Sequence, residues 1–393
     1  MFRFPQLRLR PGRPKILSIG LRKKSSTISP SPAVDFALES EGRALVFENY
    51  GSPEKVLSIK RYPRKEPKHD EIEVRFLAAP VNPSDLNQIE GVYPRQPTFI
   101  PDFGAVGGNE GVAQIIRVGT SVASSFQPGQ WVLPAKPGFG TWRTFATLKP
   151  NNIQVLPCQP GHIGLVQAST LSVNPCTAYR MLRDFVKIPK GGCVIQNGSN
   201  SGVGRMVIQL CKLSGIKTIN IVRDRPELET LKDELHSLGA DIVVTNAELR
   251  KPEMRNTIKA LHPCLGLNCV GGKVVTEMAR LLAPGAALVT YGGMSREPVS
   301  LPTSLLIFNK ISFHGFWMTQ WIDDFHSVEP SPRQAMCKEL IDMMAADQLH
   351  SPPHATLEWI EASSDSTLLE KCLRLFPSST PGTFSPPKSI FLL

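Results

Sequence analysis

The chain has 393 residues, 41% of them hydrophobic and 20% charged, and a formal net charge of +10. This length allows two domains with separate cores, and the composition excludes fibrous and largely disordered proteins. No run of 18 apolar residues occurs, so a membrane-spanning helix is excluded, and eight cysteines without a CxxC pair fit a reducing compartment better than a disulfide framework or a zinc ribbon.

Residues 1–34 carry eight basic side chains and no acidic one. A segment that is rich in arginine, contains serine and lacks acids is typical of a mitochondrial transit peptide, so we expect a protein of the mitochondrial matrix. A disordered basic arm that binds nucleic acid is the alternative. Removing these eight charges from +10 leaves a nearly neutral body of +2, which argues against a nucleic-acid surface on the rest of the chain.

Residues 43–170 contain short runs of β-forming residues separated by glycine and proline, such as RALVFENYG and EIEVRFLAAPVNP. Alternation with frequent turn residues predicts a compact, mostly β domain. Within it the stretch GVYP, residues 91–94, places Tyr93 in what reads as a polar loop. A tyrosine in a turn is usually a half-exposed aromatic side chain, and that interpretation stays open at this point.

From about residue 190 short apolar strands alternate with helical patterns. GGCVIQN, TINIV, ADIVV and AALVTYGG read as strands, and VGRMVIQLCKLSG and PELETLKDELHSLG as helices. This alternation predicts βαβ units and therefore a doubly wound domain, with a parallel sheet covered by helices on both faces. The chain after residue 318 is less regular, and its last forty residues are rich in serine and proline around one amphipathic piece, DSTLLEKCLRLF.

The stretch NGSNSGVG, residues 197–204, follows a predicted strand and opens a predicted helix. Glycines in such a loop allow a tight turn and a close approach of the backbone to a pyrophosphate, which the helix N-terminus then faces. The spacing is GxxxGxG and not the commoner GxGxxG, so the loop alone is weak evidence. Its position between a strand and a helix predicts a dinucleotide site.

The next strand is followed by Arg223, Asp224 and Arg225. A carboxylate at this place commonly binds the ribose hydroxyl of NAD, whereas arginine accommodates the 2′-phosphate of NADP. Two guanidinium groups against one carboxylate favour NADPH. A solvated charge cluster that opens the following helix is the alternative.

No zinc site is visible, because the sequence has no HExxH motif and no cysteines at ligand spacing. A hydride-transferring enzyme without a metal needs another acid or hydrogen-bond donor near the hydride acceptor.

Nine motifs that occur in one order carry a resemblance to a known family. They are VNPSDLNQIEGVYP, GAVGGNEGVAQ, GTWRT, VNPCTAYRML, VIQNGSNSGVG, INIVRDRP, LNCVGGK, VTYGGM and HGFWMTQW. Together they resemble the mitochondrial trans-2-enoyl-CoA reductases, zinc-free members of the medium-chain dehydrogenase/reductase superfamily and of its quinone oxidoreductase-like branch, over about residues 43–322. In zinc alcohol dehydrogenases the equivalent of GNEG carries a metal-binding histidine, and here Asn109 stands in its place.

The resemblance implies a fold, a reaction and a partner. The fold is α/β, with a GroES-like, mostly β catalytic domain formed by residues 40–172 and 318–393 and a doubly wound Rossmann domain, residues 173–317, that binds NADPH. The reaction passes hydride from NADPH to the β-carbon of a 2-enoyl thioester of CoA or acyl carrier protein and leaves an enolate that needs a proton. Members are homodimers with sheets joined across the subunits.

The resemblance also assigns site residues. Tyr93 becomes the proton donor, which is reasonable because a phenol is protonated at neutral pH. The implied cofactor residues are Asn174 at the nicotinamide, Asn200, Ser201, Gly202 and Val203 at the phosphates, Arg223, Asp224 and Arg225 at the 2′-phosphate, Tyr291, Gly292, Gly293, Met294, Phe316, Trp317 and Met318 along the cleft, and Lys388 in the C-terminal segment. For residues 291–294 a plain strand-end turn is the alternative, and for residues 316–318 plain core packing. Trp142 and Trp317 either line an acyl pocket or pack in the core.

The C-terminal tail departs from the family pattern around Lys388, which puts full activity in doubt, and three alternatives stay open beside the reductase. A zinc-free quinone reductase would use the same NADPH loop but would not need a proton from Tyr93. A non-catalytic NADPH-binding protein would bind the cofactor and turn nothing over. A nucleic-acid binder would lose its activity with residues 1–34.

Overall fold

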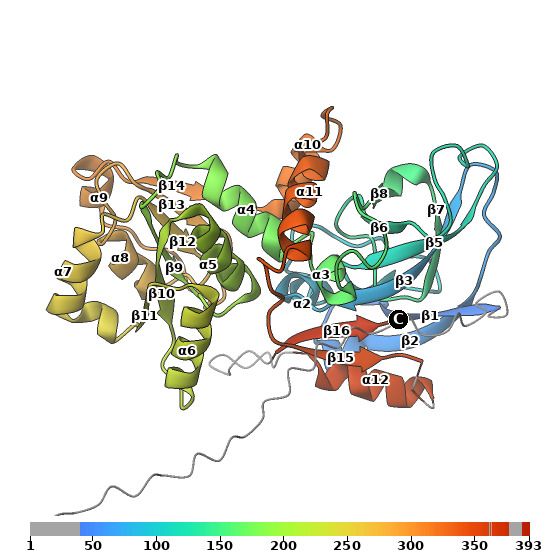
Figure 1. Cartoon of the computed structure of the whole chain (residues 1–393). Coiled ribbons are helices and arrows are strands. Elements are labelled where there is room, and N and C mark those ends of the chain that lie inside the picture. Colours follow the sequence, from blue (N-terminus) through green and yellow to red (C-terminus); the bar gives the residue numbers. More distant parts are fainter. Residues whose placement is uncertain (1–39, 361, 363, 377–386) are drawn as a thin grey trace, which may run out of the picture. The chain divides into compact units, whose positions relative to one another are not determined.

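The computed structural model describes residues 40–360, 362, 364–376 and 387–393 (Figure 1). The predicted transit peptide lies outside the described residues. Within the described ranges, the structure has no helix whose length and apolar character would let it cross a bilayer.

A six-stranded parallel sheet forms the centre of the nucleotide-binding half predicted from the βαβ pattern. Its strand order is β11-β10-β9-β12-β13-β14, which places the first strand of the pattern in the middle of the sheet. Its strands are β9 (Cys193–Asn197), β10 (Lys217–Val222), β11 (Ile242–Thr245), β12 (Leu265–Asn268), β13 (Ala287–Thr290) and β14 (Ser312–Gly315). Every residue of β9 and β12 is buried, as expected of parallel strands covered on both faces.

One helix precedes these strands and five lie between them, and several begin and end at signals in the sequence. They are α4 (Asn174–Asp184), α5 (Gly202–Ser214), α6 (Leu228–Leu238), α7 (Pro252–Ala260), α8 (Lys273–Ala279) and α9 (Thr303–Ile307). Helix α5 starts at Ser201, whose hydroxyl accepts a hydrogen bond from the Gly204 amide, and both α5 and α6 stop at a glycine with positive φ, Gly215 and Gly239. Glycine ends helices in this way because it has no Cβ to clash in the left-handed conformation.

The other half is mostly antiparallel β structure. A seven-stranded sheet has the order β15-β16-β3-β5-β6-β8, with β7 also paired to β3, and a three-stranded sheet has the order β2-β1-β4. The strands are β1 (Glu41–Phe47), β2 (Leu57–Pro63), β3 (Ile72–Pro80), β4 (Ala105–Val106), β5 (Val112–Val118), β6 (Trp131–Pro134), β7 (Phe145–Leu148), β8 (Ile153–Val155), β15 (His354–Glu358) and β16 (Lys388–Leu392). Short helices join them: α1 (Pro53–Val56), α2 (Pro83–Ile89) and α3 (Leu165–Ser169).

The chain after residue 318 is more regular than the sequence indicated. It forms α10 (Met318–Phe325), α11 (Pro332–Ala345) and α12 (Asp365–Arg374), together with β15 and β16. Helix α11 buries Met336, Cys337, Leu340, Ile341 and Met344, a spacing that marks one helix face and could have been recognised.

Strand β16 joins the sheet between β15 and β3, with Ile390 opposite Pro80 and Thr356 (Figure 1). The backbone carbonyl of Leu393 accepts a hydrogen bond from Arg75 on β3. The C-terminal segment is therefore an integral part of the sheet.

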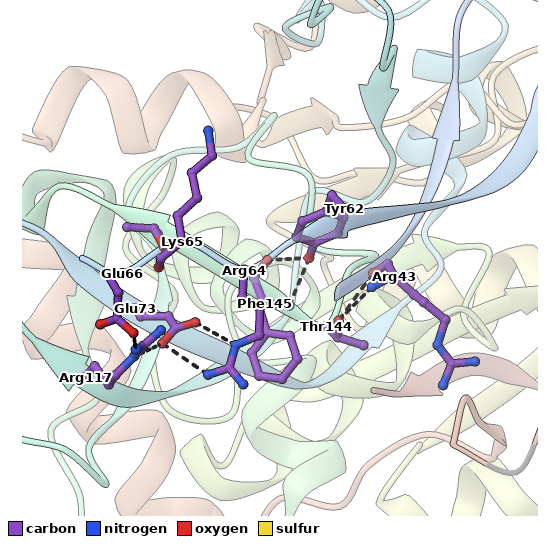
Figure 2. A network of polar contacts seen from close by, with 10 residues as sticks. Arg43, Tyr62, Arg64, Lys65, Glu66, Glu73, Arg117, Thr144 and Phe145 are labelled. Carbon is purple, nitrogen blue, oxygen red and sulfur yellow. Dashed lines mark hydrogen bonds and ion pairs between the residues drawn. The ribbon is translucent and has the colours of Figure 1, made fainter. Parts of the chain in front are cut away.

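The buried carboxylate of Glu73 on β3 organises a polar network in this half (Figure 2). It accepts hydrogen bonds from Arg64 (3.0 and 3.3 Å) and from Arg117 on β5 (2.5 Å), and Arg117 also pairs with Glu66. The Arg64 guanidinium lies 4.1 Å from the centre of the Phe145 ring on β7. The network thus fastens the end of β2 to three strands of the large sheet.

Trp142 belongs to the core of this half. It is fully buried, its ring stacks on Phe376 at 5.4 Å and meets Phe391 edge-on at 5.4 Å, and its indole N–H donates to the Pro80 carbonyl. Of the two interpretations of Trp142, core packing is the one that this environment fits.

Candidate active site

Tyr93 lies in the turn that follows helix α2, which ends at Ile89. The amides of Val92 and Tyr93 both donate to the Asn87 carbonyl, at 2.9 and 3.2 Å, and Gly91 has φ of +77°. A residue with a Cβ would be strained at Gly91 and would also meet the Tyr50 ring at 2.8 Å. The helix and this turn therefore fix where Tyr93 emerges.

The hydroxyl of Tyr93 contacts the segment that contains Trp317. The indole N–H of Trp317 donates to it at 2.7 Å, Thr319 Oγ1 lies 3.5 Å away, and the two rings meet edge-on with centres 5.8 Å apart. The indole can only donate, so it occupies an acceptor position of the phenol oxygen and leaves the phenolic O–H available as a donor. The structure thus brings the predicted proton donor and one predicted cleft residue into direct contact.

Two ion pairs hold the turn around Tyr93 against neighbouring segments. Arg95 pairs with Asp323 of α10, and Arg296 pairs with Glu90, the residue that caps α2, at 3.2 Å. In addition, the Gln88 side chain donates to the Arg95 carbonyl at 2.9 Å. The position of Tyr93 is therefore determined from both sides of the turn.

The predicted phosphate loop has the geometry of a backbone cradle. A Cβ on Gly202 would lie 2.3 Å from the side-chain amide of Asn174, and one on Gly204 would lie 2.6 Å from the Ser199 carbonyl. Ser201 caps α5, Val203 is buried, and the Asn200 carbonyl accepts a hydrogen bond from Arg205 at 3.1 Å. Asn174 and residues 200–203 thus meet at the N-terminus of a thirteen-residue helix, a place that favours an anion.

Arg223, Asp224 and Arg225 directly follow β10, at the carboxyl edge of the parallel sheet. Arg223 and Asp224 are exposed and Arg225 is partly buried. Burial and the nearby Arg223 lower the pKa of Arg225. This is the edge at which doubly wound sheets bind ligands.

The predicted cleft segments take different positions. Tyr291, Gly292 and Gly293 follow β13, the Met294 amide donates to the Cys269 carbonyl at 3.0 Å, and the Met294 side chain is 59% exposed. Burial raises the pKa of Tyr291 well above its ordinary value, with a further contribution from Cys269.

In the second cleft segment, Phe316 packs edge-on against Phe185, and Met318 is buried in the core. Of residues 316–318, only Trp317 reaches Tyr93. Trp317 itself has no core role comparable to that of Trp142.

Lys388 lies in a polar cluster that sequence reasoning missed, which we call the α2 cluster: Asn82, Asp85, Asn109, Glu110 and Lys388. The Lys388 ammonium donates to the Asn82 side-chain carbonyl, and the Asn82 side-chain amide donates to Glu110 at 3.0 Å. The other oxygen of Glu110 accepts from the Val173 amide at 2.7 Å, directly before Asn174. Lys388 is thereby connected to Val173, the residue that caps the start of α4.

Asp85 occupies the centre of the α2 cluster and the first turn of α2. It accepts hydrogen bonds from the Asn82 amide (2.7 Å) and from both the amide and the side chain of Asn109 (3.0 and 2.6 Å). Burial raises the pKa of Asp85 from 3.8 to about 6, although these hydrogen bonds and Lys388 act in the opposite direction. Burial likewise raises the pKa of Glu110 and lowers that of Lys388. The cluster holds two buried carboxylates against one ammonium group.

Asn109 connects the α2 cluster to a second loop, because its side-chain oxygen accepts a hydrogen bond from the Gly138 amide at 2.7 Å. Among the residues that the structure describes, no three histidine, cysteine, aspartate or glutamate side chains are grouped as metal ligands would be. The contacts that the structure gives Asn109 are hydrogen bonds to protein groups. The asparagine in GNEG could be recognised in the sequence, but its partners Asp85 and Gly138 could not.

Two family profiles match the chain. Residues 68–167 match the alcohol dehydrogenase GroES-like domain, and residues 202–331 match the zinc-binding dehydrogenase family. Together with the sheets described above, these matches confirm the predicted fold class, a GroES-like half with a doubly wound half.

Curated relatives and solved structures are similar over most of the chain. The mitochondrial enoyl-[acyl-carrier-protein] reductase of Homo sapiens is 49% identical over 79% of this chain and 80% of its own, and that of Schizosaccharomyces pombe is 43% identical over 71% and 77%. The Etr1p complex with NADP and crotonyl-CoA is 33% identical over 90% of this chain and all of its own, with a TM-score of 0.82. A Pseudomonas syringae quinone oxidoreductase, 21% identical with a TM-score of 0.68, shares the fold.

Proposed function

The chain belongs to the family of mitochondrial enoyl-acyl-carrier-protein reductases, within the medium-chain dehydrogenase/reductases, and on this premise we propose how its own residues carry out the family's reaction. It is an oxidoreductase that uses NADPH to reduce trans-2-enoyl thioesters to saturated acyl thioesters in mitochondrial fatty acid synthesis. The observation that carries the residue assignment is the contact between Tyr93 and Trp317.

The nucleotide site fits NADPH. The missing Cβ at Gly202 lets Asn174 pack directly against the loop at the α5 N-terminus, a position that favours an anion, and Arg223 and Arg225 supply positive charge at the next strand end. We assign the phosphates to residues 200–203, the 2′-phosphate to residues 223–225, and the cleft to Asn174, residues 291–294 and Trp317. The cofactor supplies the hydride.

Tyr93 supplies the proton that the reduced thioester needs at its α-carbon. Its O–H is free to donate because Trp317 uses only an acceptor position of the phenol oxygen. As the proton leaves, negative charge develops on that oxygen, and the indole N–H at 2.7 Å stabilises it. The ion pair of Arg95 with Asp323 keeps the phenol in place during this step.

Lys388 acts at the end of the α2 cluster in this proposal. Its ammonium holds Asn82 at the start of α2 and lies beside Glu110, which in turn holds Val173 at the start of α4. Loss of the Lys388 ammonium would therefore disturb the position of α2 and Tyr93 or that of α4 and Asn174. We keep the proposal that Lys388 acts on the cofactor, and Glu110 offers an indirect way, because it connects the Lys388 region to Val173 beside Asn174.

The protein is mitochondrial, and we propose the matrix as its compartment, with residues 1–34 as the transit peptide. We also propose residues 40–172 with 318–393 as the catalytic domain and residues 173–317 as the NADPH-binding domain. A homodimer formed through β14 is supported by the position of this strand at the sheet edge and by Leu306, Ile307 and Phe308, which are 48%, 60% and 79% exposed.

The deciding experiment follows NADPH oxidation by the purified chain with trans-2-hexenoyl-CoA and, separately, with a quinone. We expect turnover of the enoyl thioester and none of the quinone. Turnover of the quinone alone would assign the chain to the quinone reductases. NADPH binding without turnover of either acceptor would make it a non-catalytic member of the family.

A further inference from the structure

A cavity of about 280 Å³ lies beside the Tyr93 turn, and nothing in the mechanism above uses it. Its lining includes two cationic side chains, Lys136 and Arg143, the polar groups of Thr98 and Asn152, and the apolar side chains of Ile100 and Phe139. Among the described residues that line it, none is acidic. The cavity therefore concentrates positive charge without an internal counter-ion.

Arg143 is poorly satisfied for an arginine that is mostly withdrawn from water. Its guanidinium lies 4.8 Å from the centre of the Phe139 ring and donates one hydrogen bond, to the Phe139 carbonyl at 3.2 Å. Its Nε is buried with no acceptor, and no carboxylate within the described ranges pairs with it. By contrast, Arg64 and Arg205, which are similarly buried, pair with Glu73 and Glu234. Buried guanidinium N–H groups without an acceptor are costly, which points to an acceptor that is not part of this chain.

The cavity adjoins the reacting end of the site. Gly138 in the cavity wall packs next to the Arg95 side chain. A Cβ built on Gly138 would lie 3.5 Å from Arg95 Cγ and 3.9 Å from the side-chain nitrogen of Gln88. Arg95 is two residues after Tyr93, and Thr98 and Ile100 continue the same segment. A ligand whose reacting group lies at Tyr93 could therefore extend along this segment into the cavity.

The segment that leads from the Tyr93 turn to the cavity exposes apolar side chains. Val92, Phe99 and Ile100 are 68%, 38% and 47% exposed, and Ile100 also lines the cavity. A ligand that fits such a path has an arm with apolar groups that ends in an anion. The two carriers of the proposed substrate share one such arm, phosphopantetheine, which has two methyl groups next to its phosphate.

We propose that the cavity between Lys136 and Arg143 binds the phosphate of the phosphopantetheine arm that carries the enoyl group, whether the arm belongs to CoA or to acyl carrier protein. This assignment rests on the proposed function. Arg143 contributes a guanidinium held by Phe139, and Lys136, which is exposed, contributes a second positive charge to the lining of the cavity. Thr98 and Asn152 supply neutral donors beside them.

The test compares three trans-2-hexenoyl thioesters on the full chain and on Lys136→Gln. The thioesters are those of N-acetylcysteamine, which has no phosphate, of CoA, and of acyl carrier protein. We expect Lys136→Gln to raise KM for the CoA and carrier-protein thioesters by about tenfold, the effect of losing one charge-assisted hydrogen bond, and to change kcat/KM for the N-acetylcysteamine thioester by less than about twofold. Lys259→Gln in α7, the same change at another exposed lysine, is the matched control and should leave all three unchanged.

The outcomes separate the sources of the phosphate. An effect on CoA and carrier protein supports the shared phosphate, and an effect on CoA alone supports the cavity with CoA as the source. An effect on carrier protein alone would overturn the proposal in favour of contact with an acidic protein surface. Equal effects on all three thioesters, or on none, would also overturn it.

A binding measurement keeps the proposal testable if the chain reduces no thioester, which would refute the proposed function and not the cavity. Titration calorimetry with 4′-phosphopantetheine and with dephosphorylated pantetheine should show tighter binding of the phosphorylated arm by about tenfold, and less discrimination by Arg143→Lys. Equal affinity for the two arms would overturn the proposal. Thermal unfolding of Arg143→Lys shows whether that variant is folded.

Discussion

The GroES-like half contains two buried clusters of charged side chains, one with more cationic than anionic groups and one with more anionic than cationic groups. In the network of Glu73, Arg64 and Arg117, which we call the Glu73 cluster, one buried carboxylate faces two arginines, one directly after β2 and one on β5. In the α2 cluster two buried carboxylates, Asp85 and Glu110, face one lysine. The first cluster joins strands to each other, and the second joins the start of α2, the helix that leads to Tyr93, to the start of α4.

This difference in charge suggests different roles for the two clusters, stability for the Glu73 cluster and function for the α2 cluster. Arginine matches a carboxylate with several fixed donors, so the Glu73 cluster compensates the loss of hydration well. The α2 cluster leaves an excess of carboxylate in a site where burial raises the pKa of both Asp85 and Glu110. Clusters with such perturbed groups are concentrated at functional sites. We therefore expect the first cluster to determine stability and the second to determine activity.

Tyr93→Phe should have the largest effect. Loss of a general acid typically lowers a rate by about 10²- to 10⁴-fold, so kcat with trans-2-hexenoyl-CoA should fall within that range while the free energy of unfolding changes by less than about 1 kcal/mol. Steady-state kinetics and urea unfolding measure the two quantities. Tyr179→Phe, which removes the phenol that donates to Glu339, is the matched control and should retain its rate. A rate loss of less than about tenfold in Tyr93→Phe would remove Tyr93 as the proton donor.

Glu73→Gln should act on stability and not on catalysis. It leaves Arg64 and Arg117 without their shared negative charge, and breaking a buried ion pair in this way costs about 3–5 kcal/mol of unfolding free energy. Glu66→Gln is the matched control, because Glu66 also pairs with Arg117 but its side chain is 82% exposed; its cost should stay below about 1 kcal/mol. A lower kcat in folded Glu73→Gln would break the distinction between the two clusters.

Asp85→Asn should change how stability depends on pH. The folded chain keeps the Asp85 proton up to about pH 6, whereas the unfolded chain releases it near 3.8, so unfolding releases a proton between these values. The free energy of unfolding must then fall by about 2 kcal/mol as pH rises from 4 to 6, out of about 3 kcal/mol in total from this group. Urea unfolding across this range should show a shallower fall in Asp85→Asn. Parallel pH curves for the two proteins would contradict the raised pKa.

Lys388→Gln should have the smallest effect, and it distinguishes two roles. If the ammonium acts through Asn82 on α2, kcat should fall by about tenfold with the KM for NADPH unchanged, the loss expected for one charge-assisted hydrogen bond. If it acts at the cofactor, the KM for NADPH should rise instead. Lys388→Arg keeps the charge and should recover part of whichever quantity is lost. An unchanged kcat and KM would place Lys388 with the structural residues.

The part of the site that could be predicted from the sequence is the part built from neighbours in the chain. The loop around Gly202 and the arginines after β10 were recognisable because a strand, a turn and a helix follow one another within thirty residues. Tyr93 and Trp317 were each named, but their hydrogen bond joins residues 224 apart. No local pattern encodes such a contact.

The α2 cluster was missed for the same physical reason. Asp85 alone resembles an ordinary acidic residue in the first turn of a helix, where it would normally face water. Its burial depends on Asn109 and on strand β16, whose Lys388 reaches Asn82 across 306 residues. The serine- and proline-rich composition around β16 indicated irregular structure, and the pairing with β3 overrides that local preference.

The place of β16 also has a consequence for the order in which the protein assembles itself. Strand β3 receives one of its neighbours from a segment so distant that Arg75 and Leu393 are 318 residues apart. During synthesis the α/β half can fold while the Ala78–Pro80 end of β3, beyond the residues that pair with β7, still lacks its β16 partner, and such an open edge is a template for wrong pairing. Closure of the large sheet must be a late and slow event, because contacts over this distance form last. A chaperone that covers the open edge of β3 would serve this protein until residues 388–392 arrive.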